Sequence, residues 1–133
     1  MEIVEQLRRV LAERSGVRLA VVFGSTATKR RHSRSDVDVG VLLDSEVDLP
    51  ALGVELERAT GTRVDLVPLD AAPPLLRFEI ARDRLQLVAR DAHEWPEFRA
   101  RAMIDWWDWA PTARMMHRVM AERLREEARR GPA

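Results

Sequence analysis

The sequence predicts a single α+β domain: a helix, two strands joined by a turn, two helix–strand pairs, and then a wholly helical C-terminal region. Three observations predict this class. Four short segments have the apolar pattern of strands, and the segments beside them follow the helical period. Glycine or proline separates many of these segments. At 133 residues and 46% hydrophobic, the chain has the size of one domain (1–133), with a core of about 1–90 and a helical region of about 94–130.

The first two elements are predicted from hydrophobic periodicity. Residues 3–11 carry apolar side chains at helical spacing, and Gly16 stands where a C-terminal cap belongs. The segment "VRLAVVF", residues 17–23, directs alternate apolar residues to one face and stops at Gly24. We therefore expect a helix, a strand and a turn.

The second strand, "DVDVGVLL", residues 36–43, has a period of two. Its valines at odd positions are expected to face the core, so Asp36 and Asp38 share the opposite face. Taken alone, the two aspartates are also compatible with the solvent-facing side of an edge strand. Asp44 ends the strand and is predicted to be a turn residue.

The third strand follows a predicted helix. Asp48 and Pro50 open this helix, and Gly61 ends it. The strand itself is "TRVDLVPL", residues 62–69, and its alternation leaves Asp65 on the face opposite its most apolar residues. A third aspartate therefore lies within a strand that is otherwise rich in valine and leucine.

The remaining chain is predicted to be one helix, one strand and two further helices. Residues 72–83 read as a helix started by proline, and residues 84–89 as the fourth strand. From Glu94 the pattern is helical, with Pro111 expected to break it. The last helix is expected to direct inward the apolar residues Met115, Met116, Val119, Met120 and Leu124.

Composition limits the class of protein. Lysine plus arginine and aspartate plus glutamate both count 22, so no strongly basic field indicates direct nucleic-acid binding, and none is expected. The absence of cysteine excludes disulfides and thiolate metal sites. No apolar run approaches the roughly 20 residues of a membrane span, and the N-terminus has no signal-peptide core. We expect a soluble cytoplasmic protein without a membrane partner.

The three aspartates are the candidate metal ligands. If their strands are neighbours, Asp36, Asp38 and Asp65 converge. Like charges at about 4 Å repel by roughly 4 kcal/mol at an effective dielectric constant near 20, so the cluster requires a cation or must take up protons. Carboxylate oxygens favour magnesium or manganese over zinc. The sequence therefore predicts a divalent metal site.

Gly24 and Ser25 are the candidate phosphate-binding residues. Glycine lets the backbone approach a ligand closely, serine can cap a following helix, and backbone N–H groups there would favour phosphate oxygens. A phosphate cradle beside carboxylates that hold metal is the equipment of phosphoryl or nucleotidyl transfer.

The arrangement as a whole resembles a known family. In "GSTATKRRHSRSDVD", residues 24–38, ten residues separate Gly-Ser from Asp-x-Asp, and this spacing resembles the signature of the nucleotidyltransferase superfamily related to DNA polymerase beta. Asp65 in "RVDLV" matches the family's third carboxylate on a later strand. The resemblance to the minimal nucleotidyltransferases covers roughly residues 1–110.

The resemblance implies a mixed sheet of about four strands flanked by helices, and transfer of AMP from ATP. Asp36 and Asp38 would hold two magnesium ions. Asp65 would complete one metal site and help activate the attacking hydroxyl, while Gly24 and Ser25 would bind the triphosphate.

The resemblance also implies a partner. In HEPN/MNT toxin–antitoxin systems, an MNT antitoxin adds AMP to a tyrosine of a HEPN-type ribonuclease toxin. Since the chain has little room for an acceptor domain, we expect a protein adenylyltransferase that acts as an antitoxin on such a toxin. Two alternatives remain: an aminoglycoside-type nucleotidyltransferase with a small-molecule acceptor, and an antitoxin that acts by binding alone.

Several further residues have two interpretations. The basic loop 29–34 could attract a triphosphate or an acidic partner, or simply be solvated. For Arg77 we favour a salt bridge over a phosphate contact. The tryptophans of residues 104–111 are divided between the core and a partner surface, and the methionines of the last helix are assigned to the core rather than to a docking groove. No ligand spacing relates the three histidines, which are His32, His93 and His117.

Overall fold

The computed structural model describes residues 2–24, 36–83 and 85–131. Its elements follow the predicted order as far as the last strand. They are α1 (Glu2–Ala12), β1 (Val17–Phe23), β2 (Val37–Leu43), α2 (Leu49–Thr60), β3 (Val64–Pro68), α3 (Pro74–Asp83), β4 (Leu85–Ala89) and α4 (Glu94–Arg130).

The four strands form one mixed sheet in the order β3-β2-β1-β4. β1 is antiparallel to both β2 and β4, whereas β2 and β3 are parallel because α2 crosses over between them. The expectation of a four-stranded mixed sheet flanked by helices is confirmed. β2 lies inside the sheet with a partner on each side, so Asp36 and Asp38 do not belong to an edge strand.

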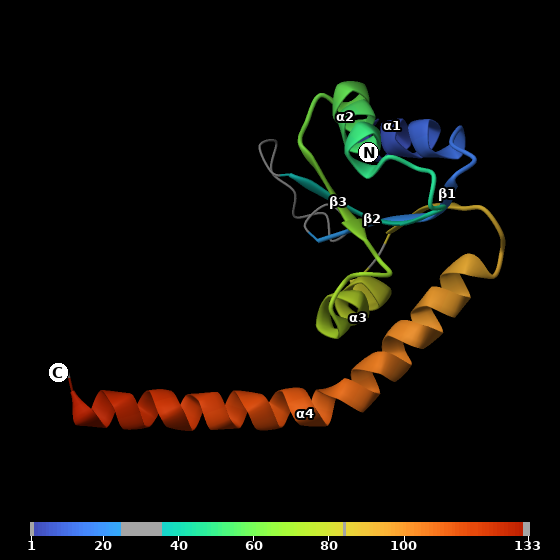
Figure 1. Ribbon diagram of the computed structural model, residues 1–133. Coiled ribbons are helices and arrows are strands. Elements are labelled where there is room, and N and C mark those ends of the chain that lie inside the picture. Colours follow the sequence, from blue (N-terminus) through green and yellow to red (C-terminus); the bar gives the residue numbers. More distant parts are fainter. Residues whose placement is uncertain (1, 25–35, 84, 132–133) are drawn as a thin grey trace.

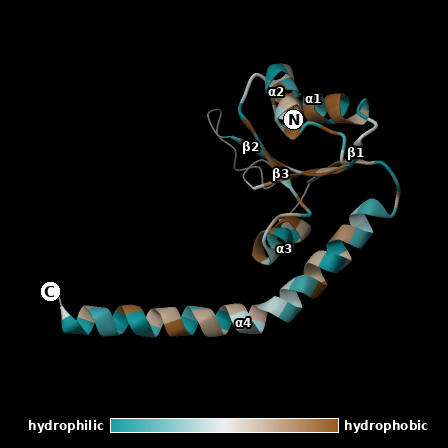
Figure 2. Cartoon of the chain, in the orientation of Figure 1, coloured by the Kyte–Doolittle hydropathy of each residue, from teal (hydrophilic) through white to brown (hydrophobic). Residues whose placement is uncertain are grey.

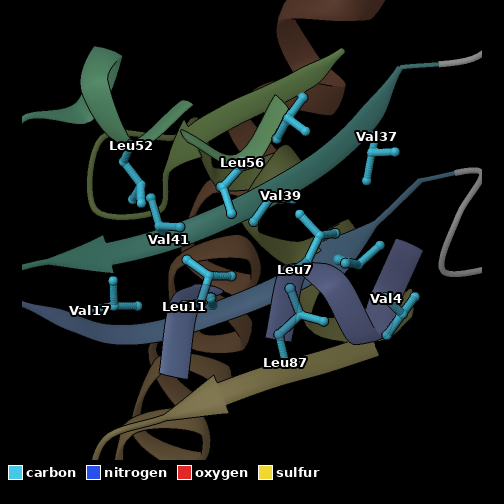
Figure 3. Close-up of a cluster of buried hydrophobic side chains, with 13 residues drawn as sticks. Val4, Leu7, Leu11, Val17, Val37, Val39, Val41, Leu52, Leu56 and Leu87 are labelled. Carbon is cyan, nitrogen blue, oxygen red and sulfur yellow. The ribbon is translucent and has the colours of Figure 1, made fainter. Parts of the chain in front are cut away.

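Helices cover both faces of the sheet (Figure 1). On one face the valines of β2 pack with Leu7 and Leu11 of α1 and with Leu56 of α2 (Figure 3). On the other face Leu19 and Val21 of β1 pack with residues of α3 and of the first half of α4, which are Ile80, Ala81, Trp95, Phe98 and Ala102. The aspartates of β2 and β3 share this second face, and they stand near the strand ends where the chain enters β2 and β3.

The predicted boundaries of α2 are confirmed by its caps. The Asp48 carboxylate accepts a hydrogen bond from the Ala51 N–H at 3.1 Å, and Gly61 ends the helix in the left-handed region with φ of 69°. The prediction for Gly16 is wrong, since α1 ends at Ala12. A Cβ at Gly16 would collide with the side chain of Val47, so close packing rather than capping requires glycine there.

The predicted break at Pro111 is also wrong. α4 runs through this proline for 37 residues. It is bent part-way along its length (Figure 1), as expected when a prolyl ring removes one backbone hydrogen bond but the turns on both sides keep theirs.

The apolar residues of the second half of α4 do not point into the core. Met115, Met116, Val119, Met120 and Leu124 are 49–58% exposed. Only the first half of α4 contacts the sheet and α3, and the second half extends away from them (Figures 1 and 2). Periodicity identified an apolar stripe, but this chain supplies nothing in its described residues to cover it. None of the described helices is both long and apolar enough to cross a membrane.

Candidate active site

Asp38 and Asp65 are register partners in the parallel pair of β2 and β3. Neighbouring strands lie about 4.8 Å apart, and side chains of register partners project from the same face. The two carboxylates therefore stand side by side on the face opposite the buried valines.

Asp36 lies one residue before β2 and, by alternation, on the same side as Asp38. Burial raises the pKa of the Asp38 carboxyl above the ordinary value of 3.8, and the negative charges of Asp65 and then Asp36 raise this pKa further. The three aspartates thus form one electrostatic cluster, as expected if their strands were neighbours.

Gly24 brings the end of β1 against this cluster. Phe23, the residue before it, is the register partner of Asp38. Gly24 has φ of 71°, and a Cβ at this position would lie 2.7 Å from Oδ2 of Asp38. A side chain would therefore be strained and would displace the carboxylate. Ser25 and the basic loop 29–34 lie outside the described residues.

The donor set of the cluster fits a divalent cation. Within residues 2–24, 36–83 and 85–131, neither Asp38 nor Asp65 forms a side-chain hydrogen bond or an ion pair, and the arginines that do pair contact other carboxylates. Carboxylates that repel one another and pair with no cationic side chain among the described residues have the chemistry of a site for a hard cation such as Mg²⁺.

A second group of possible metal ligands lies at the start of α4. One ligand atom from each of Asp91, His93 and Glu94 lies within 4.8 Å of the others. Glu94 is 3% exposed and accepts hydrogen bonds from Nε and Nη2 of Arg18 at 3.1 and 3.0 Å, and these bonds raise the Arg18 pKa. A cation there would compete with this ion pair, which joins α4 to β1. Spacing between histidines gave no indication of this group, because only one histidine takes part.

Two other predictions from the sequence are confirmed. Arg77 forms a salt bridge, with Nη1 at 2.8 Å from Oδ2 of Asp105, and its Nε donates to the Ala72 carbonyl at 3.0 Å. Asp44 follows β2 and accepts a hydrogen bond from Arg90 at 2.7 Å, a structural contact.

Of the tryptophans of residues 104–111, Trp106 is half-buried and the other two are exposed. Trp95 is buried, and Trp106 stacks on Phe78 of α3 with ring centroids 5.5 Å apart. Trp107 and Trp109 are 68% and 39% exposed.

A mixed sheet that gathers three carboxylates beside a glycine turn is typical of enzymes that transfer phosphoryl or nucleotidyl groups. Residues 5–93 match the family described as "Polymerase beta, Nucleotidyltransferase". The chain belongs to this family of nucleotidyltransferases, whose members generally use a nucleoside triphosphate and a divalent metal.

Individual relatives agree with this family. Protein adenylyltransferase MntA of Aphanizomenon flos-aquae is 26% identical over 116 residues, which are 77% of each protein. A crystal structure of a toxin–antitoxin with AMP-PNP matches with a TM-score of 0.74 and 23% identity, covering 88% of this chain and 98% of the other. The structure of tri-AMPylated Shewanella oneidensis HEPN toxin in complex with MNT antitoxin matches with a TM-score of 0.66 and 21% identity, at the same coverage. The two structural matches establish the shared fold.

Proposed function

We propose that the chain is a Mg²⁺-dependent protein adenylyltransferase that transfers AMP from ATP to a tyrosine hydroxyl of a HEPN-type toxin and so acts as an antitoxin. The observation that carries this proposal is the register pairing of Asp38 with Asp65 beside Gly24, in a chain of the nucleotidyltransferase family. The adenylyltransferase relative and the AMPylated toxin complex support AMP as the transferred group and a toxin as the acceptor.

In this proposal Asp36 and Asp38 hold two Mg²⁺ ions, and Asp65 completes one of the two sites. When bound, the ions neutralise the triphosphate and the charge that develops on the leaving pyrophosphate. The backbone N–H groups of Gly24 and Ser25 hold phosphate oxygens. The acceptor oxygen forms a bond to the α-phosphorus of ATP, the bond from that phosphorus to the pyrophosphate breaks, and Asp65 accepts the hydroxyl proton.

A protein acceptor fits the size of the chain. The described residues form one sheet, the helices that cover it and the extension of α4, so we propose that residues 1–133 act as one domain with the acceptor supplied by another protein. The chain contains no tyrosine and cannot be its own tyrosine acceptor. We place the enzyme and its target in the cytoplasm, where ATP is available.

The proposal is tested by incubating the chain with ATP, MgCl₂ and a purified HEPN-type toxin, and measuring AMP on the toxin by mass spectrometry. Asp65→Asn is expected to lower the transfer rate by about 10²-fold or more, because it removes one charge from the metal cluster. Asp70→Asn is the matched control, since Asp70 is an exposed aspartate just after the same strand, and it should keep the parental rate.

The outcomes separate the alternatives. Equal transfer by both variants, or undiminished transfer in EDTA, would contradict the proposed site. AMP found on an aminoglycoside but not on the toxin would identify a small-molecule nucleotidyltransferase. An Asp65→Asn chain that transfers no AMP yet protects cells fully from the toxin would identify an antitoxin that acts by binding.

A further inference from the structure

The apolar seam of α4 begins on the body of the protein and continues beyond it. In the first half of the helix Phe98 and Ala102 are buried against the sheet, and Trp106 stacks on Phe78 of α3. The same three-and-four spacing then continues into the second half of α4. We call this continuation the distal seam, and it consists of Trp109, Ala113, Met116, Met120 and Leu124.

The distal seam is exposed to an unusual degree for its composition. Met116, Met120 and Leu124 are 56%, 54% and 58% exposed, and no other described element packs on this part of α4. Figure 2 shows hydrophobic residues recurring along the part of α4 that extends away from the sheet. Apolar side chains at this spacing on one helix fit the ridges and grooves of a second helix, and flexible methionines adapt to such a partner.

The charge of the second half of α4 indicates which kind of partner would bind the distal seam. Residues 112–130 carry six arginines and three glutamates, so this part of α4 is basic, and Arg123 lies at the edge of the distal seam. A second copy of the chain docked on the same seam would bring two segments of net positive charge together, which disfavours self-association. A partner helix whose apolar face is bordered by acidic residues would instead be attracted to the arginines of α4.

The composition of this segment also distinguishes a protein partner from a lipid surface. Helices that lie on membranes combine a basic polar face with tryptophan, phenylalanine and leucine on the other face. Here glutamates interrupt the arginines of the polar side, and apart from Trp109 and Leu124 the distal seam consists of methionine and alanine, with no phenylalanine.

We propose that the distal seam is the docking surface for an amphipathic helix with acidic flanks on a different protein. The identification of that protein as the one that receives AMP rests on the proposed function. Docking on α4 keeps the acceptor at a high local concentration, so it lowers the KM for the acceptor and leaves the transfer step itself unchanged.

The test compares two methionines that are equally exposed. Met120 lies in the middle of the distal seam, whereas Met115 lies about 140° around the helix from it at ~100° per residue, and their exposed fractions are 54% and 53%. Binding to the same HEPN-type toxin is measured calorimetrically without ATP, in the Asp65→Asn background, so that no AMP is transferred during the measurement. Met120→Glu is expected to weaken binding by about 10-fold or more, and Met115→Glu by less than about 3-fold.

A second pair tests the charge. Arg123→Glu at the seam edge is expected to weaken binding by about 5-fold or more, while Arg125→Glu, on the opposite side of the helix, should have less than half that effect. Circular dichroism should show the same helix content in all four variants, because every substituted side chain is exposed.

The result that overturns the proposal is failure of the toxin to bind, or equal binding by Met120→Glu and Met115→Glu. A dimer of the chain alone that Met120→Glu dissociates would assign the seam to a second copy. Sedimentation with phosphatidylglycerol vesicles that Met120→Glu abolishes would assign it to a membrane. Toxin that binds through the seam but receives no AMP would contradict only the proposed function, whereas transfer with an unchanged KM in Met120→Glu would contradict only the docking surface.

Discussion

At the scale of single residues, two glycines of this chain have nearly the same positive φ and differ in their surroundings. Gly24 and Gly61 have φ of 71° and 69°. A Cβ at Gly24 would lie 2.7 Å from Oδ2 of Asp38, whereas a Cβ at Gly61 would meet no atom within 4 Å. The pair therefore separates the cost of a positive φ from the cost of displacing the aspartate.

We expect Gly24→Ala to lower AMP transfer by at least about 10-fold, because the added methyl group displaces the Asp38 carboxylate. Gly61→Ala should cost about 1 kcal/mol of stability through backbone strain and leave transfer unchanged. Initial rates and urea unfolding of both variants check this. If Gly61→Ala lost AMP transfer and Gly24→Ala kept it, the close approach of residue 24 to Asp38 would not be what transfer requires.

The candidate site was predictable from the sequence as a set of residues but not as a geometry. Alternation with period two placed Asp36 and Asp38 on one face and Asp65 on the matching face of its own strand. The pairing of Asp38 with Asp65 depends on β2 and β3 being parallel neighbours in one register, which long-range packing decides. The contact of Gly24 with Asp38 likewise depends on how β1 pairs with β2.

At the scale of elements, prediction succeeded where local signals sufficed. The caps of α2 follow from Asp48 and Gly61, whose roles depend on adjacent backbone groups. For α4 local signals did not suffice. Its periodicity predicts an apolar face on the helix, but it does not show which part of the protein covers that face. Pro111 was expected to end a helix, but a proline can be accommodated by a bend when the flanking turns remain bonded.

Arg77 joins α3 to α4, and we expect Arg77→Ala to lower the free energy of unfolding by about 1–3 kcal/mol. The substitution removes a bond to Asp105 and a bond to the Ala72 carbonyl, and Arg77 is only 16% exposed. The exposed pair of Arg130 with Glu126 provides the control, and Arg130→Ala should cost less than about 0.5 kcal/mol. Urea titrations with a common m-value measure both, and equal losses would show that the α3–α4 contact does not depend on this ion pair.

At the scale of the whole molecule, the carboxylates proposed to bind metal lower the stability of the metal-free fold, because they repel one another. The native Asp38 carboxyl has a pKa above 3.8, so in the absence of metal the folded protein binds this proton more tightly than the unfolded chain does. This contribution to stability is fully present below pH 3.8 and is lost as the pH rises through the higher native pKa. At neutral pH the metal-free fold therefore bears the repulsion of Asp38 by Asp65 and Asp36, which a bound divalent cation would relieve.

We therefore expect Asp38→Asn to raise the Tm of the metal-free protein at pH 7.5 by about 1–3 °C, a small change because solvent screens a half-exposed carboxyl. The difference from the parent should shrink as the pH falls through the native pKa and vanish below 3.8, where the Asp38 carboxyl is protonated in both states. MgCl₂ with ATP should raise the Tm of the parent and leave that of Asp38→Asn nearly unchanged, since a ligand stabilises only the state that binds it. Calorimetry measures these Tm values in EDTA and in MgCl₂ with ATP. Asp70→Asn is the control and is expected to behave like the parent. A metal-free Asp38→Asn protein less stable than the parent at pH 7.5 would show that the carboxylates do not repel one another in the native fold.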